Sequence, residues 1–199
     1  MKRKILVAFY AIVIAAGVFA EDFPAYLKME GTKIIGHEPD IIPANLVIPK
    51  GVTEIGDGAF AACMKLTSVK IPDTVTSIGT HAFIGCAFMK TINIPNSVQT
   101  IGAWAFSSLS SISSITIPES VKSIGANAFM GFGDMTFGTK TTVRYLGTVD
   151  QWMNLQEDLT DVHPELLNAM GKNWAAEGNK MGFSEGTVIK CKDGDVIIQ

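Results

Sequence analysis

The segment IPDTVTSIGTHAF, residues 71–83, decides the fold of this chain, because closely similar segments recur with a 23-residue period. Its Ile-Pro, Ile-Gly and Ala-Phe pairs return in the same order one period earlier and up to two periods later. The Ile-Pro pairs begin at Ile48, Ile71, Ile94 and Ile117, and the Ala-Phe pairs end at Phe60, Phe83, Phe106 and Phe129. Four copies in one register indicate an internal repeat and predict an array of stacked units.

A single unit cannot fold by itself. Each large apolar side chain contributes roughly 1.5–3 kcal/mol when it is buried, whereas ordering each residue of the backbone costs on the order of 1–2 kcal/mol. The apolar side chains of the second unit are Leu66, Val69, Ile71, Val75, Ile78, Ala82 and Phe83. These are too few to offset the ordering of the whole unit, so the unit must stack on its neighbours, which predicts a repeat solenoid.

Alternation within the unit predicts a short strand in which Val69 and Ile71 point inward and Ser68 and Lys70 point outward. The following proline ends the strand. We expect the glycine of each Ile-Gly pair to need a positive φ in a tight turn. The Ala-Phe pair predicts a short helical or 3₁₀ turn with the phenylalanine in the core. Stacked strands would form one parallel sheet on one side of the coil.

The pattern I-P-x-x-V-x-x-I-G-x-x-A-F resembles the BspA-type leucine-rich repeat, also called the TpLRR type, of bacterial surface and secreted proteins. The resemblance covers residues 46–132, and residues 143–152 and 189–194 are similar to the flanks that often follow such repeats. It implies an α/β repeat solenoid, a right-handed leucine-rich-repeat coil with a short parallel sheet on one side. It also implies a role in adhesion, host-matrix binding or aggregation between cells.

The N-terminus predicts export. Lys2, Arg3 and Lys4 precede an apolar run that ends at Ala20, which is typical of a cleaved signal peptide over residues 1–20. The alternative is a transmembrane anchor, but the run falls short of the ~20 residues that span a bilayer. We expect a bacterial protein of the periplasm, the cell surface or the medium, with no membrane span after cleavage.

The remaining chain divides into a core array and two ends. We expect an N-terminal cap over residues 21–45, four 23-residue repeats over 46–135, and an α+β C-terminal capping subdomain over 136–199. A distinct small domain is the alternative for the last segment. Within it, Thr148-x-x-Gln151 predicts a helix start with Trp152 and Leu155 buried, and Pro164 opens a second helix. Two final strands should meet at the Asp-Gly turn of residues 193–194.

The charge of the chain bears on its possible partners, and the positions of its cysteines bear on its core. The formal net charge of −3 provides no basic surface for nucleic acid, so DNA or RNA binding is excluded as a main role. Cys63 and Cys86 lie one period apart and share an apolar position with Leu109 and Phe132, so we expect buried thiols, with a disulfide as the alternative. With Cys191 the chain has three cysteines, an odd number.

Outward strand positions form the candidate binding surface. Their hydroxyl, amide and amino groups can hydrogen-bond a sugar or an extended peptide, so the partner would be a protein or a glycan. The alternative is a solvated surface, since small polar residues suit any exposed strand. The candidate binding residues are Asn45, Ser68, Lys70, Thr91, Asn93, Ser114 and Thr116.

Trp104 is a candidate interface anchor, because the same position in the other units holds small or polar residues. An exposed tryptophan would suit an interface and would allow self-association. The alternative is that the indole packs over Phe83 or Phe129.

No set of residues supports catalysis, a metal site or a cofactor. His37, His81 and His163 lie in three separate segments without the spacing of zinc ligands. The sequence has no P-loop, nucleophile elbow or dinucleotide motif. An ordinary turn explains the Asp-Gly-Asp segment at 193–195 better than calcium does. We therefore expect a non-enzymatic interaction protein. The alternatives are a self-associating structural component and a hydrolase within residues 136–199.

Overall fold

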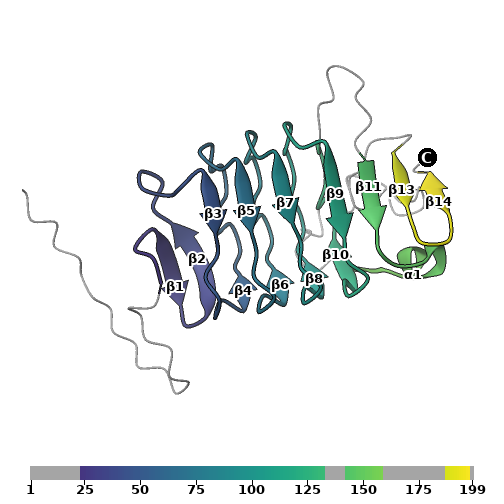
Figure 1. Ribbon diagram of the computed structural model, residues 1–199, viewed down its shortest axis with the longest axis horizontal. Helices are drawn as coiled ribbons and strands as arrows, with labels where there is room; N and C mark the ends of the chain where they lie inside the picture. Colours follow the sequence, from purple (N-terminus) through teal and green to yellow (C-terminus); the bar gives the residue numbers. More distant parts are fainter. Residues whose placement is uncertain (1–22, 133–141, 159–186, 198–199) are drawn as a thin grey trace, which may run out of the picture.

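The computed structural model describes residues 23–132, 142–158 and 187–197, which form a solenoid of stacked coils (Figure 1). The signal peptide predicted over residues 1–20 and the helix predicted from Pro164 lie outside the described residues. Two series of short strands alternate along the chain, one strand of each series per coil. The coil is therefore built mainly of strands and turns with very little helix, so the predicted solenoid is confirmed but its α/β character is not.

The first series stands side by side in Figure 1. Its strands are β3 (Asn45–Val47), β5 (Ser68–Lys70), β7 (Thr91–Asn93), β9 (Ser114–Ile117) and β11 (Thr142–Tyr145). β3, β5 and β7 form a parallel sheet in which Leu46, Val69 and Ile92 are in register. β9 and β11 begin a second parallel sheet beside it. The predicted alternation is confirmed, because each central residue of β3, β5 and β7 is buried and both flanking residues face outward.

The second series forms a sheet that the sequence analysis did not predict. Its strands are β1 (Leu27–Glu30), β2 (Lys33–His37), β4 (Glu54–Ile55), β6 (Ser77–Ile78), β8 (Thr100–Ile101), β10 (Ser123–Gly125) and β12 (Gln156–Asp158). All neighbours pair in parallel except β1 and β2, which form an antiparallel hairpin. A strand of two residues is too short to show the alternation by which strands are recognised.

The Ala-Phe segments form a third hydrogen-bonded wall. The backbone N–H groups of Phe60, Phe83 and Phe106 donate to carbonyl groups of the next coil at 2.8–2.9 Å. Within each coil the chain makes consecutive turns, and among the described residues the one α-helix is α1 (Val149–Met153). The segments form turns rather than a helix, with 3₁₀-type hydrogen bonds from residue i+3 to residue i such as Ala61 N to Gly58 O at 3.0 Å, and their other backbone groups pair along the stack.

The glycines of the Ile-Gly pairs serve a different purpose from the one we predicted. None of Gly56, Gly79, Gly102 and Gly125 has a positive φ. They are required because neighbouring coils come close together: a Cβ placed on Gly125 would lie 2.7 Å from the Cα of Ala103. The positive φ angles occur two residues later, at Gly58, His81, Trp104 and Asn127, with values of 55–60°.

A ladder of phenylalanine rings fills the core. Phe60, Phe83, Phe106 and Phe129 are fully buried and stack with ring centroids 5.2–5.7 Å apart. The four residues of the cysteine position are all buried as predicted, and the thiols of Cys63 and Cys86 are free. The Cys86 thiol donates to the Phe60 carbonyl oxygen at 3.1 Å. Burial raises the pKa of Cys86 to about 12.

The described part of the C-terminal segment continues the sheets. The predicted capping box is present at α1, where Thr148 Oγ1 accepts from Gln151 N at 3.2 Å and Gln151 Oε1 accepts from Thr148 N at 2.8 Å. Trp152 is buried against Tyr145. β13 (Val188–Lys190) pairs in parallel with β11, and β14 (Asp195–Ile197) pairs with β13 as an antiparallel hairpin. The capping roles of residues 21–45 and 136–199 stay predictions.

Candidate functional site

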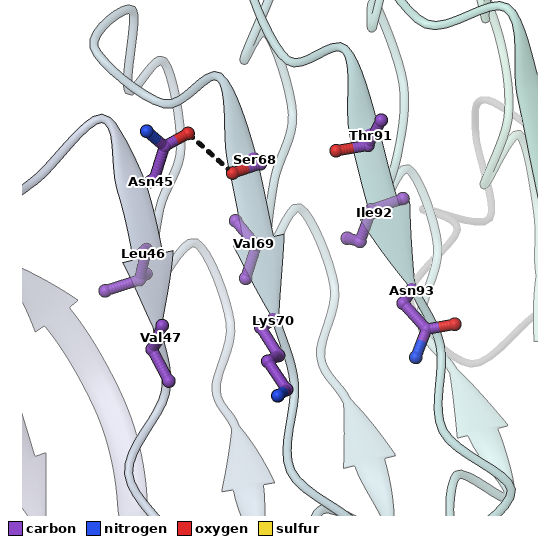
Figure 2. A pocket seen from close by; sticks show the side chains of 9 residues that line it. All are labelled: Asn45, Leu46, Val47, Ser68, Val69, Lys70, Thr91, Ile92 and Asn93. Carbon is purple, nitrogen blue, oxygen red and sulfur yellow. Dashed lines mark hydrogen bonds between the residues drawn. The ribbon is translucent and has the colours of Figure 1, made fainter.

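An open hollow of about 310 Å³ lies over β3, β5 and β7. It is lined by the three residues of each strand, and the polar side chains stand above and below the central apolar ones (Figure 2). Five of the seven predicted binding residues line this hollow: Asn45, Ser68, Lys70, Thr91 and Asn93. The other two, Ser114 and Thr116, are exposed on β9, which stands beside β7 (Figure 1).

Register within β3, β5 and β7 and between β9 and β11, together with the 23-residue step from β7 to β9, arranges these residues in two rows, which together we call the strand face. The first row is Asn45, Ser68, Thr91, Ser114 and Thr142. The second row is Val47, Lys70, Asn93, Thr116 and Arg144. Both rows run along the solenoid axis, so an extended ligand that follows the stack would meet one residue of each row per coil.

The first row is partly engaged in internal hydrogen bonds. Asn45 Oδ1 accepts from Ser68 Oγ at 2.7 Å (Figure 2) and from Thr67 Oγ1 at 3.0 Å. These bonds fix the side chains at the N-terminal end of the row and leave the Asn45 amide nitrogen as a donor. Further along, the exposed hydroxyl groups of Thr91 and Ser114 make no side-chain hydrogen bond to another described residue.

The second row carries the charge of the strand face. Lys70 and Arg144 are exposed and make no ion pair with a described residue, and Asn93 and Thr116 lie exposed between them. The row begins at Val47, whose side chain is 59% exposed. An array of this kind can donate and accept hydrogen bonds and attract an anion.

Thr142 and Arg144 are the members of the strand face that the sequence analysis missed. From β3 to β9 each strand begins one 23-residue period after the previous one, but Thr142 pairs with Ser114 across a step longer than the period. The period therefore fails to align β11 with the other strands. The available signal was the alternation of residues 142–146, which identifies the strand and places Arg144 on its outward side.

Trp104 lies away from the strand face, in the turn that follows β8. Its side chain is half-buried and stacks on exposed His81, with ring centroids 6.4 Å apart and an angle of 14° between the ring planes. Both residues have φ of 58°. The aromatic contact is thus with His81 one coil earlier, and its use as an anchor stays a prediction.

The remaining polar candidates have structural partners. His37 is half-buried, its Nδ1 lies 2.9 Å from the Ala59 carbonyl oxygen, and its ring stacks on Phe60. Asp193 Oδ1 accepts from the backbone N–H of Val149 at 2.8 Å, and Asp195 pairs with Lys190. His163 lies outside the described residues. In the described ranges no group of three or more His, Cys, Asp or Glu side chains is placed to hold a metal ion.

A coil of 23-residue units with stacked parallel strands, a phenylalanine ladder and an outward polar face defines a leucine-rich-repeat solenoid. The sequence profile of the BspA-type leucine-rich repeat region matches residues 43–148 with six copies. The chain belongs to this family. The matched range runs past the fourth 23-residue unit and includes β11.

Several solved structures resemble the chain. A leucine-rich repeat protein from Bacteroides ovatus is 36% identical over 50% of this chain and 27% of its own, with a TM-score of 0.42. A leucine-rich cell surface protein from Faecalibacterium prausnitzii is 26% identical over 64% of this chain and 38% of its own, with a TM-score of 0.48. The T. pallidum leucine-rich repeat protein TpLRR is 25% identical over 68% and 80%, with a TM-score of 0.46.

The chain thus spans only about a quarter of the B. ovatus protein and two fifths of the F. prausnitzii protein. No curated protein matches it. Within the described ranges, none of the helical structure is long and apolar enough to cross a membrane.

Proposed function

We propose that this chain is an exported, non-enzymatic binding protein that attaches through its strand face to a host matrix protein, a glycan or another cell. The observation that carries the proposal is the hollow over β3, β5 and β7, lined by exposed hydroxyl, amide and amino groups. Membership of a repeat family of bacterial surface proteins supports an interaction role.

The scaffold suits binding because it holds the strand face rigidly. Parallel strand pairing fixes the spacing of the rows, and the stacked phenylalanine rings fill the core behind them. A ligand therefore meets side chains on a backbone that is already ordered, which lowers the entropic cost of association.

The strand face is short, so tight attachment needs more than one copy. Five strands span four spacings of about 4.8 Å, or roughly 19 Å along the stack. This length limits the contacts that one molecule can make. Several molecules displayed on one surface would raise the effective affinity without any new contact.

A binding screen against matrix proteins and glycans tests the proposal. The protein purified from producing cells is compared with a double variant, Asn93→Arg with Thr116→Glu, which leaves the net charge unchanged and places bulky groups in the second row. The matched control is Gln99→Arg with Thr100→Glu, at exposed positions where β8 begins. We expect ligands that bind the parent and the control but are lost in the Asn93/Thr116 variant. The proposal fails if no ligand binds, or if both double variants behave alike.

Sedimentation of the same preparation tests the alternative function, a self-associating structural component. A concentration-dependent oligomer that Trp104→Ser abolishes would favour this alternative. A monomer over a wide concentration range would exclude it and leave adhesion as the function.

A further inference from the structure

The strand face collects positive charge in a protein whose formal net charge is −3. Across β3, β5, β7, β9 and β11 the charged residues are Lys70 and Arg144, and both lie exposed in the second row. Lys90, directly before β7, is a further exposed cation that lies outside both rows. The charge of the strand face is therefore opposite to that of the whole chain.

Two carboxylates near the strand face are engaged in ion pairs. Glu119, two residues after β9, pairs with Lys192, and Asp195 on β14 pairs with Lys190. Asp73 lies three residues after β5, outside both rows. Neither Lys70 nor Arg144 has an ion-pair partner among the described residues, so both side chains are available to an incoming anionic group.

The spacing of these cations suits a linear polyanion. Lys70 lies on β5 and Arg144 on β11, and the two intervening strands are β7 and β9. The exposed side chains of Asn93 and Thr116 lie between them. A polymer that follows the axis would meet an ammonium group, an amide, a hydroxyl group and a guanidinium group in turn.

We infer that the strand face binds an acidic polysaccharide, with anionic groups at Lys70 and Arg144 and sugar hydroxyl groups at Asn93 and Thr116. The inference rests on the proposed function and specifies its ligand. A sugar polymer fits better than an acidic peptide, because β3, β5 and β7 pair within one sheet and β9 and β11 within another, so a peptide laid across this face would have to bind through side chains. Val47 is the only apolar side chain of the two rows, so a protein ligand would find almost no apolar anchor.

Binding of polygalacturonate, measured by calorimetry or surface plasmon resonance on the purified protein, tests the inference. Neutral dextran and poly-glutamate serve as comparison ligands. The variants are Lys70→Gln, Arg144→Gln and their charge reversals to Glu. The matched control is Lys122→Glu, an exposed lysine directly before β10 that changes the net charge by the same amount. Thermal melting confirms that each variant is folded.

We expect polygalacturonate to bind and dextran not to bind. Each charge reversal should weaken binding about tenfold, the neutral variants less, and Lys122→Glu hardly at all. Affinity should fall as salt is raised from about 0.05 to 0.3 M, because the added salt shortens the Debye length, which is about 10 Å at 0.1 M, and so screens exposed charges more strongly. Absence of binding, an equal loss in Lys122→Glu, or equal affinity for poly-glutamate would each overturn the inference.

The two proposals fail in different ways. Ligands that are lost in the Asn93/Thr116 variant but are unaffected by Lys70→Gln and Arg144→Gln would keep the strand face as the binding surface and reject an anionic ligand. A screen in which no ligand depends on Asn93 and Thr116 would reject the proposed function itself.

Discussion

Replacement of Phe106 by alanine should be among the most destabilising single changes in the chain. The ring is fully buried and stacks between Phe83 at 5.7 Å and Phe129 at 5.6 Å. Truncating a buried phenylalanine costs roughly 3–5 kcal/mol through lost transfer energy and the cavity that remains. Loss of stacking on both sides favours the upper part of this range, since an aromatic pair adds about 0.5–1.5 kcal/mol beyond burial.

Equilibrium unfolding in urea, followed by circular dichroism, measures the effect. A loss of about 4–5 kcal/mol would remove a large share of the roughly 5–15 kcal/mol typical of a domain. The matched control is Lys70→Ala, an exposed change on the strand face that should alter the free energy of unfolding by less than about 0.5 kcal/mol. Equal effects of the two substitutions would refute the assignment of inward and outward positions.

Three further changes test other parts of the structure. Gly102→Ala would place a Cβ against the backbone of Thr80 in the preceding coil and should cost about 1–3 kcal/mol in urea unfolding; a neutral effect would refute the close approach of coils. Ser108 has a φ of 61°, and Gly85 and Gly131 occupy the same position in the adjacent coils. Ser108→Gly should therefore relieve backbone strain and raise the free energy of unfolding by about 0.5 kcal/mol. A lower free energy of unfolding would show that the serine is not strained. Because burial raises the pKa of Cys86 from 9.0 to about 12, the folded state holds its thiol proton more tightly, so stability is complete below pH 9 and falls between pH 9 and about 12. Cys86→Ala should remove part of this fall, and an unchanged pH profile would argue against a buried thiol.

The residues of the core could be predicted from the sequence because they recur at the same positions of every 23-residue repeat. Inward positions such as Val69, Ile78 and Phe83 recur once in every repeat, and each is buried as its position in the repeat predicts. The helix start at Thr148 was also predictable, since the two side chains that cap each other lie three residues apart. In these cases the information is local or strictly periodic.

Other features depend on contacts between coils, which the sequence of one coil does not show. The strands β4, β6 and β8 have two residues each and exist as strands only through pairing with neighbours. Gly125 is needed because the backbone of Ala103 lies against it, whereas the sequence alone fits a tight turn with positive φ equally well. Arg144 joins the second row across a step that is longer than the period.

The division between inward residues, which hold the coils together, and outward residues, which face the solvent, explains how this fold can carry a binding site. Backbone pairing along three walls and the inward side chains hold the coil together. The outward side chains of residues such as Lys70 and Asn93 therefore contribute little to the stability of the fold. Substitutions there change the chemistry of the surface at little cost to stability. Among the described residues Lys70 and Arg144 have no ion-pair partner, and a cationic row on an acidic protein is the feature that supports our proposal of an anionic ligand.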